Sequence, residues 1–428
     1  MLYERWRKIA SDHRSEIALY DPARGERWTF AQLAAAAEVG GEPGLIAFPQ
    51  GRTFIFTLLR AWNRGQIVCP LEPGQIPPVF EQLPTGCVHL KTTSATTGEA
   101  RVVAFTGEQL AADAENIVAT IGLRPDWPNL GVISLAHSYG FSNLVLPLVL
   151  HGIPLVLADS PLPEAVRRAA ASTEAVTLAA VPALWRTWHE ARSIPGSVRL
   201  AISAGAPLSL ELERCVFAGQ GLKLHNFYGS SECGGIAYDD SALPRTDAAC
   251  AGKPLRNVEL SIRPDGCLQV RSRAVGQTYW PEPAKNLADG CFQTSDLAEI
   301  SDGSVYLRGR SGDQIHIAGR KVSPETIERA LLLHPGVREC LVFGTPSADA
   351  ERTEIIVACI AARSMLSSES LKQFLLEKLP AWQIPREWMF VKNLEVNGRG
   401  KISRAEWRRN YLTLESVAAK AEDEGTGV

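Results

Sequence analysis

Short apolar runs alternate with stretches of helical spacing over the first half of the chain. Residues 29–37 have the spacing of an amphipathic helix, and residues 45–48 and 67–68 have the composition of strands. Further strand-length apolar runs occupy 132–136, 154–157, 177–181 and 199–205. Because such runs, separated by helical segments, are typical of parallel strands covered by helices, the pattern predicts an α/β fold with packed, mostly parallel sheets.

The pattern changes twice further along the chain. After residue 248, the strand-length pieces 258–262, 267–272 and 305–309 are separated by Gly, Asp and Pro, which predicts a small, largely antiparallel β region. After residue 310, helical and strand patterns are mixed and predict a small α+β domain. Its expected helices are 324–333 and 370–378, and its expected strands are 339–343, 354–360 and 387–391. We expect residues 413–428 to form a disordered tail.

Composition narrows the function. The chain has 428 residues, with 44 Lys and Arg against 47 Asp and Glu, a formal net charge of −3. This balance argues against a protein built to bind nucleic-acid backbone, which needs a basic surface, and against a polybasic membrane-surface protein. The hydrophobic share of 45% excludes disorder as the main state.

The sequence predicts a cytoplasmic protein. Residues 1–16 are charged throughout and lack the apolar core of a signal peptide. The most apolar stretch, 141–158, is interrupted by Asn, Pro, His and Gly, so we expect buried structure there and no membrane span. The nine cysteines include no C-x-x-C pair, which favours reduced thiols and indicates neither a metal site nor a disulfide framework.

A loop rich in hydroxyl groups, T-S-A-T-T-G at 93–98, precedes the apolar strand 102–105 and a helix for which Thr106 is the expected N-cap. Its hydroxyls and backbone N–H groups could wrap phosphate oxygens. A solvated turn has the same composition, so the residues alone leave both interpretations open. The loop is not a Walker-type loop, because G-x-x-x-x-G-K-[ST] is absent.

Two further segments carry candidate ligands. Y-G-S-S-E at 228–232 places an acid, Glu232, after small hydroxyl residues, where it could hold Mg²⁺ beside a phosphate or could lie in a surface turn. T-S-D at 294–296 places Asp296 where it could accept hydrogen bonds from a ribose diol.

The order and spacing of these segments carry more information than each alone. With W-T-F-A-Q-L at 28–33, G-R-S-G-D-Q-I-H-I-A-G-R-K-V-S-P-E-T-I-E at 309–328 and N-G-R-G-K-I-S-R at 397–404, they extend over nearly the whole chain. Together they resemble the adenylate-forming superfamily of acyl-CoA synthetases, non-ribosomal peptide adenylation domains and luciferases.

The resemblance implies a two-step reaction with ATP and Mg²⁺. A carboxylate attacks the α-phosphate to give an acyl-adenylate and pyrophosphate, and the thiol of CoA or of a carrier-protein phosphopantetheine then displaces AMP. The attacking carboxylate is already ionised at neutral pH, so the first step needs alignment and charge neutralisation and no strong base. The implied domains are 1–309 for ATP and the acid, a hinge at 310–313, and a mobile domain at 314–412 that carries the catalytic lysine.

The resemblance also implies roles for individual residues of this sequence. The catalytic residues would be Lys401, Glu232 (the metal ligand) and His137. The nucleotide-binding residues would be Thr93, Ser94, Thr96, Thr97, Gly98, Gly205, Ala206, Asn226, Phe227, Tyr228, Gly229, Ser231, Asp296 and Arg310. The acyl pocket would be lined by His137, Tyr139, Phe141, Ser203 and Gly205.

In the implied mechanism, Lys401 would stabilise charge at the α-phosphate in the first step. The C-terminal domain would then swing about the hinge at Asp313, withdraw Lys401 and bring the Gly319 segment to the thiol tunnel.

Several positions depart from the superfamily pattern. Ala95, Ala100 and Arg101 stand where the phosphate loop usually has Gly, Pro and Lys, and His316 stands where Lys is usual. About 90 residues precede the loop, so the resemblance implies a shortened N-terminal subdomain. A nucleotide-binding pseudoenzyme is therefore an alternative to an active ligase.

The acid is only partly constrained. No acidic residue accompanies Tyr139, Phe141 and Ser142, and an unpaired buried ammonium would be costly, so amino acids are disfavoured. His137 could gate the carboxylate route or could be a packing residue. The apolar run 141–150 favours an aryl or a short- to medium-chain fatty acid. CoA is the expected thiol, a carrier protein is the alternative, and the oligomeric state is left open.

Overall fold

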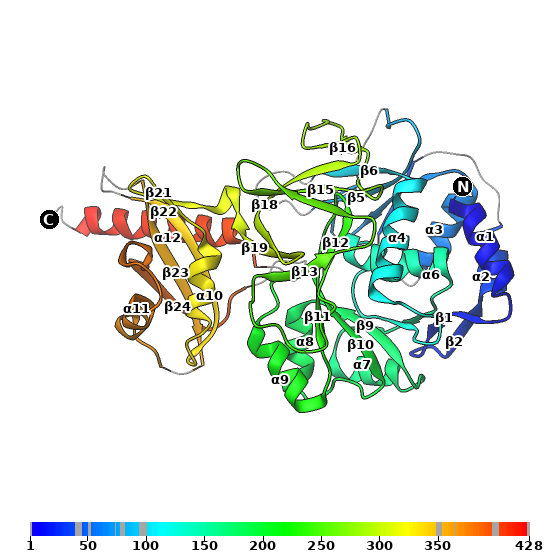
Figure 1. Ribbon diagram of the computed structural model, residues 1–428, viewed down its shortest axis with the longest axis horizontal. Coiled ribbons are helices and arrows are strands. Elements are labelled where there is room, and N and C mark those ends of the chain that lie inside the picture. The colour runs from blue at the N-terminus through cyan, green and yellow to red at the C-terminus, as the bar shows by residue number, and fades with distance from the viewer. Residues whose placement is uncertain are drawn as a thin grey trace. The chain divides into compact units, whose positions relative to one another are not determined.

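The computed structural model describes residues 2–38, 45–49, 53–72, 74–77, 82–93, 101–347, 353–363, 365–395 and 402–425 (Figure 1). The chain divides into two compact units. The first unit holds most of the chain up to Tyr306, and the second unit holds Ser295–Glu299 and Leu307–Val428.

Two sheets and the helices that pack on them dominate the fold. The larger sheet has the strand order β14-β15-β18-β19-β13-β12-β11-β10-β9-β7-β8-β1-β2, and the smaller sheet has the order β16-β6-β5-β4-β3. In the larger sheet, the neighbouring strands β8, β7, β9, β10 and β11 are parallel to one another. The strands β11-β12-β13-β19 and the pair β14-β15 of the same sheet are antiparallel. The predicted α/β class is confirmed, and so is the antiparallel β region after residue 248.

The strands of the larger sheet are β1 (Ile17–Asp21), β2 (Glu26–Thr29), β7 (Asn129–Gly131), β8 (Leu155–Leu157), β9 (Val176–Ala180), β10 (Val198–Ser203), β11 (Leu224–Ser230), β12 (Gly234–Tyr238), β13 (Cys250–Pro254), β14 (Glu259–Ile262), β15 (Cys267–Arg271), β17 (Leu287–Ala288), β18 (Cys291–Ser301) and β19 (Ser304–Arg310). Those of the smaller sheet are β3 (Leu45–Pro49), β4 (Ile67–Leu71), β5 (Cys87–Thr92), β6 (Val102–Thr106) and β16 (Thr278–Trp280). The helices of the first unit are α1 (Leu2–Asp12), α2 (Phe30–Ala37), α3 (Phe54–Asn63), α4 (Gly107–Ile121), α5 (Ser138–Gly140), the π-helix η1 (Phe141–Val145), α6 (Leu146–His151), α7 (Pro163–Ala170), α8 (Pro182–Glu190) and α9 (Leu210–Gln220).

Helix α4 begins where the sequence predicts. The Thr106 hydroxyl accepts a hydrogen bond from the Gln109 backbone, and the Gln109 side chain accepts one from the Thr106 backbone, which completes a capping box. The helix ends at Gly122, whose φ of 76° is a left-handed conformation that glycine adopts at low cost. The expected strand before α4 is present as β6.

The strand predicted at 132–136 is wrong. Strand β7 ends at Gly131, and the chain then folds back into α5 and η1. The reason is a close backbone approach, because a Cβ atom at position 140 would lie 2.0 Å from the Ser134 carbonyl oxygen and only glycine fits there. The apolar run that follows is buried, as predicted, and none of the helices in the described ranges is long and apolar enough to cross a membrane.

Helix α1 is not among the elements predicted from the sequence, because the many charged residues at these positions obscure its apolar periodicity. Its buried residues Leu2, Trp6 and Ala10 recur every four positions, so they form one apolar stripe while the charged residues lie elsewhere on the helix. Trp6 is fully buried against Phe30 of α2.

The second unit is built around the three-stranded sheet β22-β23-β24, whose alternate residues serve two cores. Val342, Ile356 and Ala358 belong to the core that includes residues of α10 and α11, and Val357 and Cys359 belong to the core that includes residues of α12. The elements are η2 (Ser311–Asp313), β20 (Ile315–Ile317), β21 (Arg320–Val322), α10 (Pro324–Leu331), β22 (Val337–Pro346), β23 (Glu354–Ala362), α11 (Ser368–Leu376), η3 (Ala381–Gln383), β24 (Glu387–Val391) and α12 (Arg404–Gly425).

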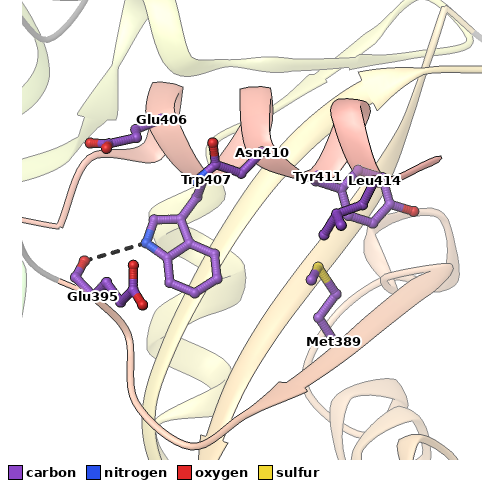
Figure 2. A pocket seen from close by; sticks show the side chains of 7 residues that line it. All are labelled: Met389, Glu395, Glu406, Trp407, Asn410, Tyr411 and Leu414. Carbon is purple, nitrogen blue, oxygen red and sulfur yellow. Dashed lines mark hydrogen bonds between the residues drawn. The ribbon is translucent and has the colours of Figure 1, made fainter. Parts of the chain in front are cut away.

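The C-terminal helix corrects one prediction. Residues 413–428 were expected to be disordered, but α12 continues as far as Gly425. The segment contains good helix formers such as Ala, Glu and Lys and no proline, so its polarity is compatible with a helix. A pocket lies between α12 and β24 (Figure 2), and no residue with a predicted catalytic or binding role lines it. Its lining consists of Met389, Glu395, Glu406, Trp407, Asn410, Tyr411 and Leu414.

Candidate active site

The base of the predicted phosphate loop is a bridge between two antiparallel strands. The Thr93 N–H donates to the Arg101 carbonyl oxygen at 2.8 Å, and the Arg101 N–H donates to Thr93 Oγ1 at 3.1 Å. The Arg101 guanidinium carbon lies 5.1 Å from the centre of the Tyr279 ring. The other predicted loop residues, Ser94, Thr96, Thr97 and Gly98, lie outside the described residues, as do Ala95 and Ala100.

Tyr279 connects this base to the predicted metal ligand. It pairs with Val103 across β16 and β6, and its hydroxyl donates to Glu232 Oε1 at 3.0 Å. Burial and the Glu232 carboxylate both raise the pKa of Tyr279, so the phenol stays protonated and can donate. The Glu232 backbone is fixed as well, since its carbonyl accepts from the Gly276 N–H at 2.7 Å.

Glu232 fits the chemistry of magnesium. Among the described residues, no three His, Cys, Asp or Glu side chains gather into a group that could hold a metal ion. Mg²⁺ prefers one or two carboxylates together with water and substrate phosphates, so a single positioned glutamate, linked through Tyr279 to the base of the predicted phosphate loop, is compatible with it.

The segment predicted to bind the acid is a short helical turn. His137 is the N-cap of α5, and its Nδ1 accepts from the Tyr139 N–H at 3.2 Å. Next to it, the Ser138 hydroxyl donates to Ser231 Oγ at 2.9 Å, which joins this turn to the segment that ends in Glu232. Phe141 points into the interior, where its ring is 1% exposed and stacks on His89 at 4.2 Å.

Tyr139 and Phe227 bring the acid segment to strand β11. Their rings are nearly parallel, with centroids 6.2 Å apart and an interplanar angle of 18°. Burial raises the pKa of Tyr139, whose hydroxyl is 3.5 Å from the Ile202 carbonyl oxygen. The aromatic side chains of two predicted groups, one for the acid and one for the adenine, therefore meet.

A predicted acyl-pocket residue, Ser203, and a predicted nucleotide-binding residue, Asn226, are neighbours on two parallel strands. Ser203 of β10 is in register with Asn226 of β11. The Ser203 hydroxyl is fully buried and has no hydrogen-bond partner among the described residues. Beyond it the chain turns at Gly205, whose φ of 84° is left-handed, and becomes exposed at Gly205 and Ala206. Tyr228 is partly exposed and Gly229 is exposed, so this edge is open to a ligand.

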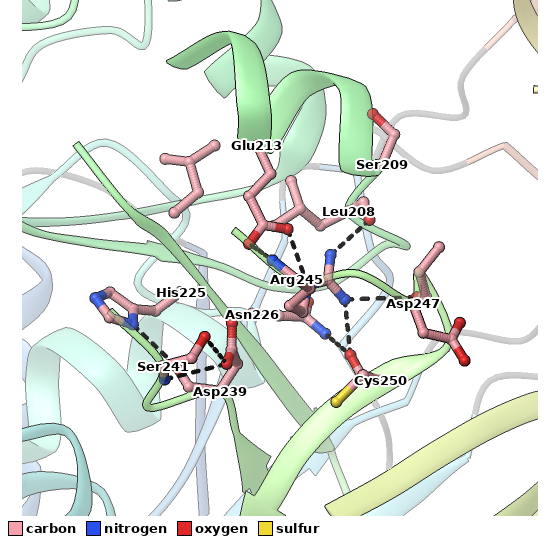
Figure 3. A network of polar contacts seen from close by, with 12 residues as sticks. Leu208, Ser209, Glu213, His225, Asn226, Asp239, Ser241, Arg245, Asp247 and Cys250 are labelled. Carbon is pink, nitrogen blue, oxygen red and sulfur yellow. Dashed lines mark hydrogen bonds and ion pairs between the residues drawn. The ribbon is translucent and has the colours of Figure 1, made fainter. Parts of the chain in front are cut away.

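A buried network of charges holds strand β11 in place (Figure 3). Arg245 Nε donates to Glu213 Oε2 at 2.9 Å, and its Nη1 donates to the Cys250 carbonyl oxygen at 2.7 Å. The same carbonyl accepts from Asn226 Nδ2 at 3.2 Å. Lys223, one residue before β11, pairs with both Glu213 and Asp239. The network therefore fixes Asn226, although sequence reasoning missed all four charged members because they are far apart in the chain.

In the second unit, the two predicted ribose-binding residues contact each other. Arg310 Nε and Asp296 Oδ1 are 2.9 Å apart, on the neighbouring strands β19 and β18. The Arg310 side chain is 47% exposed and the Asp296 side chain 17%. Gly319 occupies the turn of the β20–β21 hairpin with a φ of 75°, and no atom beyond its chain neighbours lies within 4 Å of the Cβ position.

The predicted hinge residue belongs to a second ionic network. Asp313 ends the short helix η2, and its carboxylate pairs with the Arg404 guanidinium. Arg404 also donates to Glu328 at 2.9 Å and to the Val342 carbonyl oxygen at 2.8 Å. Lys401, three residues before Arg404, lies outside the described residues.

Family models and relatives identify the chain. The model of the AMP-binding enzyme family matches residues 47–280, and the model of the AMP-binding enzyme C-terminal domain matches residues 326–401. The first match alone covers more than half of the chain. The chain belongs to the AMP-binding enzyme family.

Named relatives of this AMP-binding enzyme are acid–CoA ligases. It is 27% identical to the 2-succinylbenzoate–CoA ligase of Bacillus cytotoxicus over 394 residues, which cover 82% of this chain and 80% of the relative. It is 26% identical to a feruloyl-CoA synthase of an Amycolatopsis species over 361 residues, which cover 79% and 72%. The predicted class, an AMP-forming acid–thiol ligase, is confirmed.

Solved structures share the fold. The o-succinylbenzoate CoA synthetase of Bacillus subtilis, solved with its acyl-adenylate intermediate, matches with a TM-score of 0.80 at 21% identity, over 94% of this chain and 97% of that chain. The same synthetase solved with ATP and a magnesium ion matches with a TM-score of 0.79 at 20% identity, over 94% and 98%.

Proposed function

We propose that this AMP-binding enzyme activates an aryl carboxylic acid with ATP and transfers the acyl group to the thiol of CoA. The observation that carries the proposal is the stacked pair Tyr139–Phe227, in which the partly exposed Tyr139 offers an aromatic surface backed by the buried Phe227. An aryl ring packs well on such a surface. Two relatives are named for aryl acids, 2-succinylbenzoate and ferulate.

The buried acid next to Ser142 is already paired inside the protein. The nearby buried acid is Asp113, whose carboxylate accepts from the Ser142 hydroxyl at 2.6 Å and from the Gly235 N–H at 3.1 Å. It is also 3.5 Å from the Lys91 ammonium. Because this carboxylate is already neutralised and hydrogen-bonded, it offers no counter-ion for an amino acid substrate.

In the proposed first step, the ionised carboxylate forms a bond to the α-phosphorus of ATP as the bond to pyrophosphate breaks. The loop residues Thr93, Ser94, Thr96, Thr97 and Gly98 would hold the β- and γ-phosphates. Glu232, held by Tyr279, would bind the magnesium ion, which supplies charge neutralisation on the phosphates when bound. Ser231 would face the α-phosphate.

The base and sugar would be held by separate groups. The backbone at Gly205 and Ala206 would run alongside the adenine. The base would be flanked by Asn226, Phe227 and Tyr228, and Gly229 would add no side chain beside it. Asp296 and Arg310 would hold the ribose hydroxyls, and their mutual contact leaves the carboxylate oriented for this task. His137 would guide the carboxylate to its place, and Lys401 would stabilise charge on the α-phosphate.

In the second step, the thiol would attack the acyl carbon, AMP would leave and the thiol proton would be released. We propose that residues 1–309 hold ATP and the acid, that 310–313 form the hinge and that 314–412 carry Lys401 and the Gly319 segment. The β20–β21 hairpin that contains Gly319 exposes His316, Arg320 and Lys321, three side chains suited to the phosphates of CoA.

Carboxylate-dependent exchange of pyrophosphate into ATP tests the proposal. A panel of aryl, fatty and amino acids should give exchange only with aryl acids, and CoA should then yield the acyl thioester. A thioester formed only with a phosphopantetheinylated carrier protein would assign the carrier as the acceptor. No exchange with any acid would make this chain a pseudoenzyme and refute the proposal.

Lys401→Ala tests the division between the two steps. It should abolish exchange and leave thioester formation from supplied acyl-adenylate intact, because the lysine would act only on the α-phosphate in the first step. Arg308→Met, which removes an exposed cation of the same unit, serves as the control and should change neither step. Equal loss of both steps in Lys401→Ala would contradict the assignment.

A further inference from the structure

A buried lysine lies on strand β5, which leads to Thr93 at the base of the predicted phosphate loop. Lys91 lies on β5, two residues before Thr93, and is 3% exposed. Its ammonium donates to Ser142 Oγ at 3.1 Å and is 3.5 Å from Asp113 Oδ2. It also lies 4.6 Å from the centre of the Phe105 ring, a cation–π contact in a dry site.

Asp113 completes this group from helix α4. It is 1% exposed, and each of its oxygens has a separate partner. Oδ2 accepts from the Ser142 hydroxyl at 2.6 Å, and Oδ1 accepts from the Gly235 N–H at 3.1 Å. A Cβ atom at the neighbouring position 234 would lie 1.9 Å from Oδ1, so the chain after Glu232 is pressed against this carboxylate.

Three segments with different tasks meet at these side chains. Lys91 belongs to the strand that leads into the phosphate loop. Ser142 belongs to the π-helix η1, which continues from the acid segment at His137 and Tyr139. Gly235 follows the predicted magnesium ligand Glu232 by three residues. π-helical turns are rare and cluster at functional sites, and here the turn delivers Ser142 to the ion pair.

The contacts exclude a direct role in the chemistry. Lys91 is almost inaccessible, and its ammonium is occupied by Ser142 and Asp113. Burial lowers the pKa of Lys91, and the Asp113 carboxylate opposes this effect and favours the charged form. A buried ion pair of this kind contributes little to stability compared with an apolar replacement. Its main effect is to fix the relative positions of the segments that carry its members.

We propose that Lys91, Asp113 and Ser142 form a positioning site that holds the phosphate loop, the acid segment and the Glu232 segment in one frame for acyl-adenylate formation. This inference rests on the proposed function, because only the first step needs phosphates, acid and magnesium aligned together. The second step acts on an acyl-adenylate that is already formed.

Two variants separate positioning from folding. Lys91→Met leaves the Asp113 carboxylate buried and uncompensated, which should lower the melting temperature. In the double variant Lys91→Met/Asp113→Asn both charges are gone, and the amide at position 113 can still accept from Gly235 and donate to Ser142. Its melting temperature should therefore return toward that of the original chain, although the tether from β5 to Ser142 is lost.

The double variant should lower kcat for pyrophosphate exchange about 100-fold, the effect of a misplacement on the order of 1 Å. Thioester formation from supplied acyl-adenylate should be unchanged. Val166→Ala, a substitution at a fully buried position of α7, is the control for reduced stability. It should lower the rates of exchange and of thioester formation equally, in proportion to the unfolded fraction. Exchange that recovers together with the melting temperature in the double variant would overturn the inference.

Calorimetric titration with MgATP tests the inference without turnover. The double variant should bind MgATP about 10-fold more weakly, the effect of one lost hydrogen bond. If the original chain binds MgATP but exchanges with no acid, the proposed function fails. The difference in MgATP affinity between the original chain and the double variant then tests the positioning site independently of that function. An affinity equal to that of the original chain overturns the inference, and so does an original chain that binds no MgATP.

Discussion

The network around Arg245 makes a quantitative prediction about strand β11. Arg245→Met removes the hydrogen bonds to Glu213, to the Leu208 carbonyl oxygen at 2.8 Å and to the Cys250 carbonyl oxygen at 2.7 Å. Glu213 is fully buried, so its carboxylate would keep only Lys223 and a backbone N–H as partners. Breaking a buried charge pair in this way costs about 3–5 kcal/mol of folding free energy.

Urea unfolding of the full chain measures this cost, and Arg168→Met is the matched control. Arg168 pairs with Asp159 at 2.9 Å, but both side chains are about half exposed, so its loss should cost less than about 1 kcal/mol. Arg245→Met should also raise the KM for ATP, because the Cys250 carbonyl oxygen would lose the group that fixes it against Asn226. A cost equal to that of the control, with an unchanged KM, would refute the reasoning.

Three further predictions concern single side chains. Tyr279→Phe should raise the magnesium concentration needed for exchange by about 10-fold, because Glu232 loses a charge-assisted hydrogen bond, and a magnesium titration checks this. Burial raises the pKa of Glu328 above 4.5, although Arg404 opposes the shift, so the stability that its protonated form contributes should be full below pH 4.5 and lost as the pH rises through the raised pKa. Thermal unfolding of Glu328→Gln across pH should show this dependence removed. Asp313→Pro should keep exchange and lose thioester formation, because a proline at 313 also restricts the backbone of Gly312 before it, whereas Asp313→Ala should keep both.

Local features of the fold could be predicted because the residues that specify them are neighbours in the chain. The capping box at Thr106, the strand before it and the strand at 387–391 each depend on a short window of sequence. The apolar run at 132–136 has strand composition as well, yet the approach of Gly140 to the Ser134 carbonyl turns the chain instead. The conformation of this segment is therefore determined by a tertiary contact, which the local sequence pattern does not indicate.

The same distinction applies to the site. Glu232 and Asp296 stand in recognisable motifs, so residue type and order alone suggest a candidate role for each. Tyr279, 47 residues after Glu232, and Lys91 with Asp113 act through contacts between distant elements. A lone lysine or tyrosine in a strand carries no sequence signature of a role in a site. The pairing of β5 and β16 with β6 places these two side chains near their partners.

The contacts of Arg404 determine where the backbone beside the predicted hinge can turn. Asp313 is anchored through Arg404 to Glu328 and to β22, so its peptide unit moves with the second unit's own core. Ser311 and Gly312 are exposed, and a Cβ atom at position 312 would meet nothing. For the proposed hinge, these contacts favour a turn at Ser311 and Gly312, one or two residues before Asp313, with Asp313 held by the core of the second unit.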